Sequence, residues 1–264
     1  MKKLSAVIIV LAMTVSMEAA AFASEAVSAA GEDPEGYKNG YPIVTIESEI
    51  PVQENFAKNV ASTVSHHPYE DYQGYIIFYG ASNFARWTKM AKDMPEYKVL
   101  NQAFGGSTDI DLVHFANEAV FPYNPAIVFF QTGSNDYVNL EGTDEERIEK
   151  CMNFKKQMFS AFHEIMPDTK FVVMSGLLLP GRSEYLELTQ KINEELKQLA
   201  DETDYIYFVD AADLTYDGTD FHEELFVKDL IHLNEDGQHL WYEGYIKPAI
   251  ELVIEENGLD SVRQ

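Results

Sequence analysis

The sequence predicts an α/β fold built on a five-stranded parallel sheet with helices on both faces. Two observations support this prediction. Short apolar runs rich in β-branched and aromatic residues alternate with longer segments of helical periodicity. Such alternation is typical of parallel strands joined by right-handed crossovers. The chain of 264 residues, 46% hydrophobic and 24% charged, is also long enough for one domain of this kind with a full core.

The start of the chain is typical of a signal peptide, which we place at residues 1–23. Two lysines form a charged start, residues 4–17 form an apolar centre, and residues 21–23 form a cleavage site that contains two alanines. An uncleaved anchor is the alternative, although the apolar run is short for a membrane span. We therefore expect a secreted or periplasmic (extracytoplasmic) protein without membrane contact after cleavage of the signal.

Residues 24–70 are expected to form a lead-in segment that packs on the domain, and residues 71–258 form the domain itself. Within the lead-in, the sequence predicts a short edge strand at 41–46 and a weak helix at 53–64. The first strand of the main sheet is expected at 75–79, followed by a helix over about 84–91. The other strands are expected at 99–104, 126–130, 171–174 and 205–209, and the other helices at 109–119, 144–166, 184–200 and 234–256.

The balance of charges argues against two classes of partner. The chain has 44 acidic and 19 basic residues, a formal net charge of −25, and no cluster of Lys and Arg. A field of this sign repels nucleic-acid phosphates and anionic lipid surfaces, so we expect neither as a partner. The single cysteine, Cys151, cannot form an internal disulfide. The oligomeric state stays open.

Small residues and polar groups follow three of the predicted strands. The three turns are Gly80-Ala81-Ser82, Gly105-Gly106-Ser107 and Gly133-Ser134-Asn135-Asp136. The carboxyl ends of parallel strands share one edge of a sheet, where α/β proteins bind ligands. Ser82 stands where a buried strand passes into a helical pattern, so its hydroxyl would project into this crevice. A simple helix-capping role is the alternative for this serine.

A fourth segment, Asp229-Leu230-Ile231-His232, precedes the last predicted helix. Acyl transfer to a serine needs a nucleophile, a base, an acid that orients the base, and donors for the oxyanion. Ser82, His232 and Asp229 fit the first three roles. The backbone N–H groups of Ser82 and Gly106 and the side-chain amide of Asn135 fit the oxyanion donors. This scheme needs no metal and no cofactor.

Together these blocks resemble those of the SGNH/GDSL hydrolases. The matching stretches, in order, are G-A-S-N (80–83), N-Q-A-F-G-G-S (101–107), T-G-S-N-D (132–136) and D-L-I-H-L-N-E-D-G (229–237). The platelet-activating factor acetylhydrolase-like branch is the most similar one, because Trp87 and Pro122 also resemble its pattern. The resemblance covers roughly residues 70–250. One departure is Ala81, which stands where the name-giving G-D-S motif has Asp.

The resemblance implies a flavodoxin-like three-layer α/β/α sandwich that hydrolyses ester bonds. It implies Ser82 as nucleophile, Gly106 and Asn135 as oxyanion donors, and the pair Asp229 and His232 as supporting acid and base. The competing G-x-S-x-G elbow of α/β-hydrolases fails because position 84 is Phe.

His222 is a rival base, but no Asp stands three residues before it, since position 219 is Thr. Asp136 is expected to be a structural hydrogen-bonding partner, and Arg86 is expected to form a local ion pair.

We therefore expect an exported serine esterase that removes short acyl groups, such as acetate, from carbohydrate. Asn83 and Tyr137 are expected to contact this acylated small-molecule or glycan substrate. The acidic segment 210–233 favours a solvated rim over a lipid-docking lid. A lipase- or phospholipase-like esterase and an inactive secreted glycan-binding protein are the alternatives.

Overall fold

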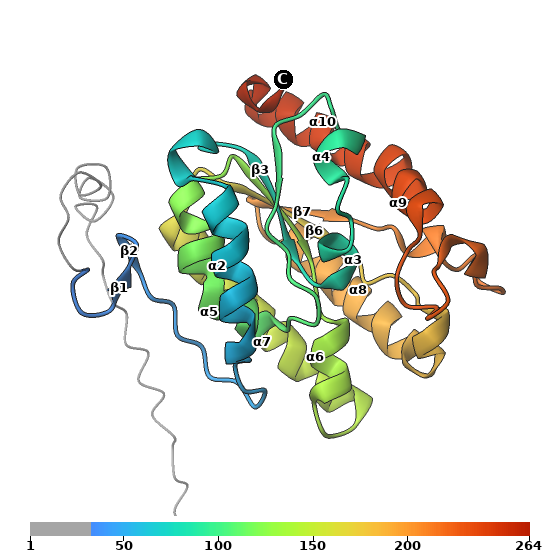
Figure 1. Cartoon of the computed structure of the whole chain (residues 1–264). Coiled ribbons are helices and arrows are strands. Elements are labelled where there is room, and N and C mark those ends of the chain that lie inside the picture. Colours follow the sequence, from blue (N-terminus) through green and yellow to red (C-terminus); the bar gives the residue numbers. More distant parts are fainter. Residues whose placement is uncertain (1–32) are drawn as a thin grey trace, which may run out of the picture.

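The centre of the computed structural model is a sheet of five parallel strands in the order β4-β3-β5-β6-β7 (Figure 1). The strands are β3 (Ile76–Gly80), β4 (Val99–Asn101), β5 (Ile127–Gln131), β6 (Lys170–Met174) and β7 (Ile206–Val209). In chain order β3 is the first strand of this sheet, β4 pairs with one side of it, and β5, β6 and β7 follow on the other side. This is the flavodoxin-like order, so the predicted fold class is confirmed. The strand order reverses beside β3, which is where such sheets form their ligand crevice.

The structure describes residues 33–264. The predicted signal peptide at 1–23 and the first part of the predicted lead-in, 24–32, lie outside the described residues. Within the described part, no helix has both the length and the apolar character needed to cross a membrane.

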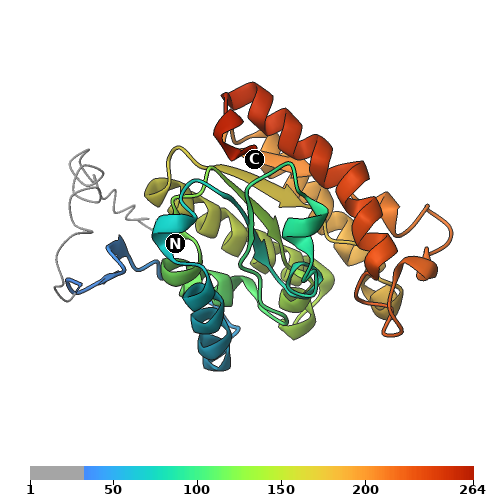
Figure 2. The same cartoon turned by 45° about the horizontal axis from the view of Figure 1, so that its top comes forward.

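Each strand contributes side chains to two separate hydrophobic cores, because successive side chains point to opposite faces of the sheet. Ile77 and Tyr79 of β3 join the core on one face, and Ile76 and Phe78 join the core on the other. All four side chains are fully buried, which explains why the strand is apolar throughout. Figures 1 and 2 show the two helical layers that cover the faces. The first layer holds α2 (Ala57–His66), α5 (Asp109–Ala119), α7 (Asp144–Ile165) and α8 (Leu186–Asp201), and the second holds α3 (Ser82–Ala85), α4 (Met90–Asp93), α9 (Glu235–Trp241) and α10 (Lys247–Asn257).

The long helices begin where the sequence supplies capping residues. Thr108 and Asp111 form a reciprocal capping box at the start of α5, and Thr143 with Glu146 does the same for α7. Asn234 caps α9 by accepting a hydrogen bond from Gly237 N–H. These caps account for the close agreement between the predicted and observed helix starts.

Two predicted helices differ from the observed ones, and the strand predicted at 99–104 ends at Asn101. The helix expected after Ser82 is divided into α3 and α4, and the Asn101 side chain donates to the carbonyl oxygens of Phe84 and Trp87 at the break. The last helix contains a π turn at Tyr242–Ile246 before α10, where Pro248 cannot donate a backbone hydrogen bond.

The edge strand predicted at 41–46 is wrong beyond its first two residues. Tyr41–Pro42 forms β2, which pairs only with β1 (Tyr37–Lys38) in a small antiparallel ribbon apart from the main sheet. The described part of the lead-in nevertheless contacts the domain. The Asn117 side chain of α5 donates to the carbonyl oxygens of Lys38, Tyr41 and Pro42.

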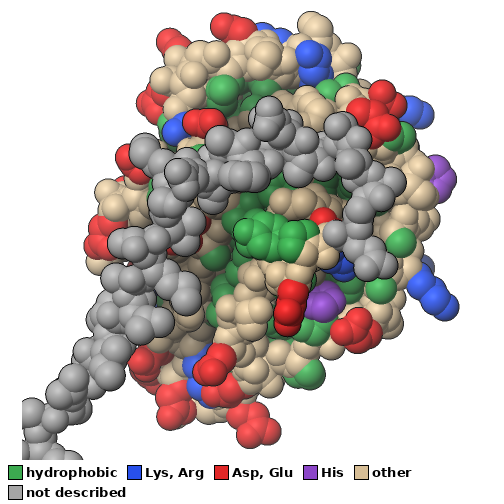
Figure 3. Space-filling model, turned by 90° about the vertical axis from the view of Figure 1, so that its left-hand side faces the viewer, with side chains coloured by type: hydrophobic (Ala, Val, Ile, Leu, Met, Phe, Trp, Pro, Cys, Tyr) green, Lys and Arg blue, Asp and Glu red, His purple; other side chains and the backbone are tan. Residues whose placement is uncertain are grey.

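Acidic side chains are spread over the surface in accordance with the net charge of −25. On the face drawn in Figure 3 they lie mainly around the margin, and hydrophobic side chains gather nearer the middle.

Candidate active site

Ser82 is the first residue of α3, and a single residue, Ala81, separates it from the end of β3. The turn is tight because β3 and β5 approach closely here: a Cβ on Gly80 would lie 2.2 Å from the carbonyl oxygen of Gln131. Ala81 N–H donates to that same oxygen. The small residues before Ser82 thus let the strand end close to its neighbour, and the serine stands at the carboxyl edge of the sheet.

A continuous chain of hydrogen bonds connects Ser82 to Asp229. Ser82 Oγ lies 2.8 Å from His232 Nε2, and His232 Nδ1 lies 2.8 Å from Asp229 Oδ2. An ionised carboxylate can only accept, so Nδ1 carries the ring proton and Nε2 accepts from the Ser82 hydroxyl. The structure therefore brings together the three side chains predicted as nucleophile, base and orienting acid.

Asp229 is held as an anion by the turn on which it lies. Partial burial raises the pKa of Asp229, but the hydrogen bonds from the His232 side chain and from the backbone N–H groups of Ile231 and His232 lower that pKa further, so that it falls well below its ordinary value. Both N–H groups donate to Asp229 Oδ1 at 3.0 Å, while Oδ2 faces the His232 ring. The carboxylate is therefore both charged and fixed in orientation.

This turn needs an unusual backbone conformation. Leu230, between the acid and the base, has φ of +56°, a region that costs a residue other than glycine about 1–2 kcal/mol. Gly181 N–H donates to the Leu230 carbonyl oxygen at 2.8 Å. A Cβ on Gly181 would lie only 2.7 Å from the carbonyl oxygen of Asp229. The segment after β6 thus supports the turn that carries Asp229 and His232. The two backbones approach so closely that position 181 has no room for a side chain.

The predicted oxyanion donors lie on the two neighbouring strand ends. Gly106 has φ of +91°, a conformation that favours glycine. Space is not the reason for glycine here, because an added Cβ would meet only the Phe56 ring, at 3.7 Å. The adjacent Gly105 lies against Ser82, since a Cβ on Gly105 would lie 3.6 Å from Ser82 Cβ. The Asn135 side chain donates through Nδ2 to the Ser107 carbonyl oxygen at 2.9 Å, which ties the two turns together.

Arg182 fixes the other end of the Asn135 amide. Its Nη2 donates to Asn135 Oδ1 at 3.2 Å, and its Nη1 donates to the Ser134 carbonyl oxygen at 2.9 Å. Because Oδ1 of Asn135 accepts from the Arg182 guanidinium, the amide is held with Nδ2 pointing away from Arg182 and able to donate. The sequence did not indicate this arginine, because it stands 47 residues from Asn135 and belongs to none of the recognised blocks.

A buried ion pair lies beneath the same turns. Lys155 of α7 and Asp109 at the start of α5 are almost completely buried and lie 2.8 Å apart. Burial lowers the pKa of Lys155, but the negative charges of Asp109 and Asp136 raise it, so the pKa lies above its ordinary value and the amine is charged. Asp136 accepts from Asp109 N–H at 2.8 Å, which agrees with its predicted structural role. Burial and the charge of Asp109 raise the pKa of Asp136 well above its usual range.

The two predicted substrate contacts are placed elsewhere by the structure. Asn83 is 6% exposed, and its side chain bonds the backbone around the base: Oδ1 accepts from Leu233 N–H and Nδ2 donates to the Ile231 carbonyl oxygen. Tyr137 is 2% exposed, and its hydroxyl bonds Thr189. Both side chains are occupied inside the protein, so Asn83 positions the His232 loop and Tyr137 belongs to the core.

The remaining histidines do not join this site. His222 Nδ1 bonds the Leu214 carbonyl oxygen, whereas His232 contacts the serine, so the geometry favours His232 over its rival. His66 and His67 each bond a backbone carbonyl of α2. Among residues 33–264, no group of three or more His, Cys, Asp and Glu side chains is arranged to hold a metal ion.

A cavity of about 350 Å³ adjoins the base. It is lined by His232, by Arg86 and Lys89 after the nucleophile, and by the first residues of α9. Lys89 pairs with Glu235 across it. Of the three hydrogen-bonded side chains, His232 is the one that lines this open space.

Comparisons with known proteins support this description of the fold. The family model described as the GDSL-like Lipase/Acylhydrolase family matches residues 70–240. A search of curated protein sequences gave no match.

Three solved structures illustrate the structural similarity. An acylhydrolase from Bacteroides fragilis has a TM-score of 0.63 at 17% identity, over 78% of this chain and 100% of its own. A Streptococcus pneumoniae protein described as a platelet activating factor has a TM-score of 0.62 at 17% identity, over 73% of this chain and 91% of its own. A catalytic mutant of an acetylxylan esterase from Geobacillus stearothermophilus has a TM-score of 0.51 at 16% identity, over 65% of this chain and 94% of its own. At these identities the similarity concerns the fold.

Proposed function

Because the chain belongs to the GDSL-like lipase/acylhydrolase family and is an esterase, we propose that it removes short acyl groups from carbohydrate esters with Ser82 as nucleophile. The observation that carries this proposal is the hydrogen-bond chain from Ser82 Oγ through His232 to Asp229, with both links at 2.8 Å. These distances are within the range in which a base takes the proton of a nucleophile.

In the proposed reaction, Ser82 Oγ attacks the ester carbonyl carbon while its proton passes to His232 Nε2. Asp229 stabilises the imidazolium that forms. The tetrahedral intermediate then expels the alcohol, which takes the proton from His232, and leaves an acyl group on Ser82. Water attacks this acyl-enzyme, gives its proton to His232, and releases the carboxylic acid and the free serine.

The negative oxygen of the intermediate would be bound by the N–H groups of Ser82 and Gly106 and by Asn135 Nδ2. Two interactions preorganise Asn135 before any substrate binds: its donation to the Ser107 carbonyl and the contact from Arg182. Donors fixed in this way stabilise the transition state without reorganisation during the reaction.

A small acyl group on a neutral sugar is the substrate class that we propose. The acetylxylan esterase from Geobacillus stearothermophilus acts on an acetylated carbohydrate by its name, and its structure has the same fold. The net charge of −25 opposes anionic lipid surfaces and anionic polymers. Within the segment 210–233, Val227 is the single large apolar side chain that is exposed, which is a poor basis for a lipid-docking lid.

Export and branch membership are further parts of the proposal. The charged, apolar and small-residue pattern of residues 1–23 supports cleavage of a signal peptide and action outside the cytoplasm. Trp87 and Pro122 support membership in the platelet-activating factor acetylhydrolase-like branch. Trp87 is buried, stacks near Trp241, and donates to Asp93, so it also has a packing role.

The deciding experiment compares acetate release from acetylated xylan and mannan with hydrolysis of long-chain lipid emulsions. Wild-type protein should release acetate, and Ser82→Ala should lose this activity by several orders of magnitude at nearly unchanged melting temperature. Faster turnover of the lipid, with a rate increase above its critical micelle concentration, would favour the lipase alternative. Failure of a fluorophosphonate to label Ser82, together with sugar binding, would favour an inactive glycan-binding protein.

A further inference from the structure

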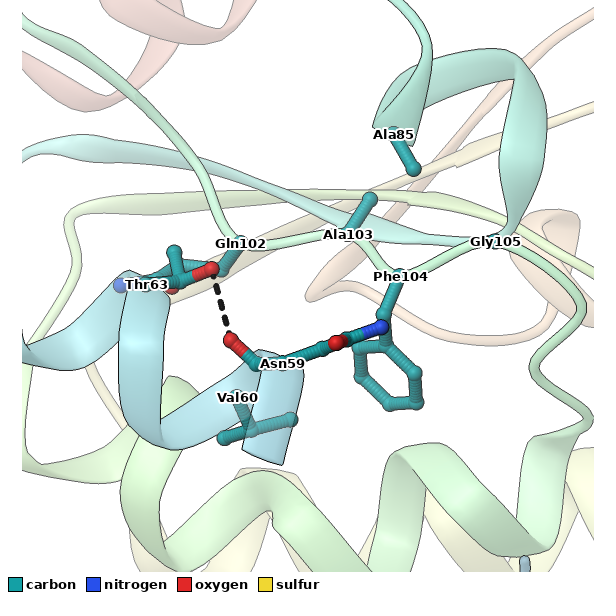
Figure 4. A pocket seen from close by; sticks show the side chains of 8 residues that line it. All are labelled: Asn59, Val60, Thr63, Ala85, Gln102, Ala103, Phe104 and Gly105. Carbon is teal, nitrogen blue, oxygen red and sulfur yellow. Dashed lines mark hydrogen bonds between the residues drawn. The ribbon is translucent and has the colours of Figure 1, made fainter. Parts of the chain in front are cut away.

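A second cavity, of about 220 Å³, lies between α2 and the loop that follows β4 (Figure 4). Its lining comes from three parts of the chain: Asn59, Val60 and Thr63 of α2, the loop 102–105, and Ala85 of α3. Helix α2 precedes the stretch 70–240 that the family model matches, so one wall of this cavity is supplied by the lead-in segment.

The cavity adjoins the nucleophile. Gly105 is part of its lining and would place a Cβ 3.6 Å from Ser82 Cβ. Ala85 belongs to the short helix that Ser82 begins, and its methyl group faces that of Ala103 in Figure 4. A group bound in the cavity and an ester carbonyl at Ser82 can therefore belong to one small molecule.

The lining is neutral, although the protein as a whole is strongly acidic. Asn59, Thr63 and Gln102 supply two amides and a hydroxyl, while Val60 and Phe104, which are 5% and 4% exposed, supply apolar surface. Figure 4 shows the Asn59 carboxamide turned toward the Phe104 ring. A ligand with hydroxyl groups at its edge and C–H groups on its faces satisfies both kinds of surface. A charged ligand would find no partner among the lining side chains. The Thr63 hydroxyl already donates to the Asn59 backbone carbonyl oxygen, so a plain alkyl chain would leave the amides of Asn59 and Gln102 without a partner in the cavity.

The size of the cavity narrows the choice of ligand. At about 30 Å³ per liquid water it corresponds to about seven water molecules, which is more than an acetyl group needs. It is smaller than the roughly 300–1,000 Å³ of pockets for drug-sized ligands. One sugar ring matches this range, whereas a longer oligosaccharide would extend beyond the cavity.

We propose that this cavity is a subsite for one neutral sugar ring on the alcohol side of the ester. The inference rests on the proposed function, because it assumes that Ser82 cleaves an ester carried by the same molecule. It assigns to α2, and to Asn59 in particular, the recognition of the sugar next to the scissile bond.

The test fills the cavity without touching the reacting groups. In Asn59→Trp a large ring replaces the amide, and in the control variant Ala61→Trp the same ring is placed at an exposed position of α2 that does not line the cavity. For acetylated xylo-oligosaccharides, Asn59→Trp should lower kcat/KM at least tenfold, mainly through KM. For p-nitrophenyl acetate, which has no sugar, the loss in Asn59→Trp should be much smaller than on the sugar ester, and the control Ala61→Trp should stay within twofold of wild type.

Several outcomes would overturn the subsite. One is an equal loss on both substrates, and another is identical behaviour of Asn59→Trp and Ala61→Trp on the sugar ester. Losses confined to p-nitrophenyl butyrate and hexanoate would assign the cavity to the acyl chain instead. In all of these cases a wild-type protein active on the sugar ester leaves the proposed function standing.

A wild-type protein that is inactive on every sugar ester would contradict the proposed function, and the subsite would then be judged by binding alone. Calorimetry with unacetylated xylobiose on Ser82→Ala gives this measurement. Binding that is lost in the double variant Asn59→Trp/Ser82→Ala supports the subsite. Absence of binding to Ser82→Ala, or equal binding to the double variant, overturns it.

Discussion

Arg86 Nη1 lies 3.2 Å from Asp229 Oδ2, the same oxygen that faces His232 Nδ1 at 2.8 Å. The guanidinium therefore partly neutralises the carboxylate that orients the base. The Arg86 side chain is 54% exposed, so solvent and salt weaken this interaction. Arg86 is thus placed to adjust the charge balance of the site without contacting the serine.

Replacing Arg86 with Met should move the acid limb of the kcat/KM profile to higher pH. Without the cation, the charge of Asp229 acts more fully on the His232 ring and favours its protonated form, which cannot accept the serine proton. Exposed ion pairs contribute little, about 0.2–1 kcal/mol, so the change in the profile should be small. The measurement is a pH profile with p-nitrophenyl acetate at low and high salt. Lys92→Met removes the same charge from an exposed position and serves as control, and an equal shift in that variant would contradict the specific pairing.

Asp229→Asn should remove an acid-dependent part of the stability. Partial burial opposes ionisation of Asp229, but its hydrogen bonds with His232 and with two backbone N–H groups lower its pKa in the folded protein. A carboxylate with a depressed folded pKa stabilises the fold above its unfolded pKa, about 3.9, and this contribution is lost as the pH falls below that value.

The difference in Tm between wild type and Asp229→Asn should therefore be constant above about pH 5 and shrink below about pH 4. Because the Asp229 side chain is 38% exposed, we expect a small effect. The exposed Asp168→Asn variant controls for the loss of one negative charge. A difference that grows as the pH falls has the wrong sign for this linkage.

Asn135→Ala should lower kcat about 100-fold with little change in KM. Loss of one oxyanion donor removes about 3 kcal/mol of transition-state stabilisation, which the ground state does not share. Arg182→Met keeps the amide but frees its orientation, so it should give a smaller loss in kcat. Asn153→Ala, at an exposed position of α7, is the control and should leave kcat unchanged. A change confined to KM would transfer Asn135 from transition-state stabilisation to substrate binding.

The sequence predicted the parts of the site that are local in the chain. Ser82 was recognisable because a buried strand, a small-residue turn and a helix start follow one another within a few residues. Asp229 and His232 stand three residues apart, so one turn could be expected to carry both. The positive φ of Leu230 and the support from Gly181 left no such pattern, because they depend on two loops that meet only in the folded protein.

The residues that the sequence could not supply act over long separations. Lys155 follows the ordinary pattern of an amphipathic helix, and nothing in that pattern distinguishes it from its exposed neighbour Lys156. Asn83 belongs to the first block and Tyr137 directly follows the third, but a position in the sequence does not fix which way a side chain points. In the structure both point into the protein.

Gly181→Ala should lower activity more than its single added methyl group would suggest. The new Cβ would lie 2.7 Å from the Asp229 carbonyl oxygen and 2.9 Å from Ile231 Cγ1, so the turn that carries the acid and base must move. We expect kcat to fall at least tenfold, because small displacements of reacting groups have large effects on rate. Gly244→Ala is the control: no atom lies within 4 Å of its added Cβ, and in a helix the change should raise stability by about 0.5–1 kcal/mol. Full activity of Gly181→Ala at unchanged Tm would show that the turn tolerates the displacement.

Lys155→Met should destabilise the protein strongly, whereas Lys156→Met should not. Lys155 Nζ lies 2.8 Å from Asp109 Oδ2 in a fully buried site, and Thr132 Oγ1 donates to the same carboxylate. Removal of one partner of a buried pair leaves an uncompensated charge, which costs about 3–5 kcal/mol, or about 6–20 °C in Tm for a domain of this size. Lys156 is exposed, so its variant controls for the loss of charge and for the new methionine. The double variant Lys155→Met/Asp109→Asn should regain part of the lost stability, because the buried charge is then absent as well. A Tm of Lys155→Met within 2 °C of that of Lys156→Met would contradict this prediction. It would mean that Asp109 does not carry an unpaired charge in the variant and that the ion pair does not stabilise the fold.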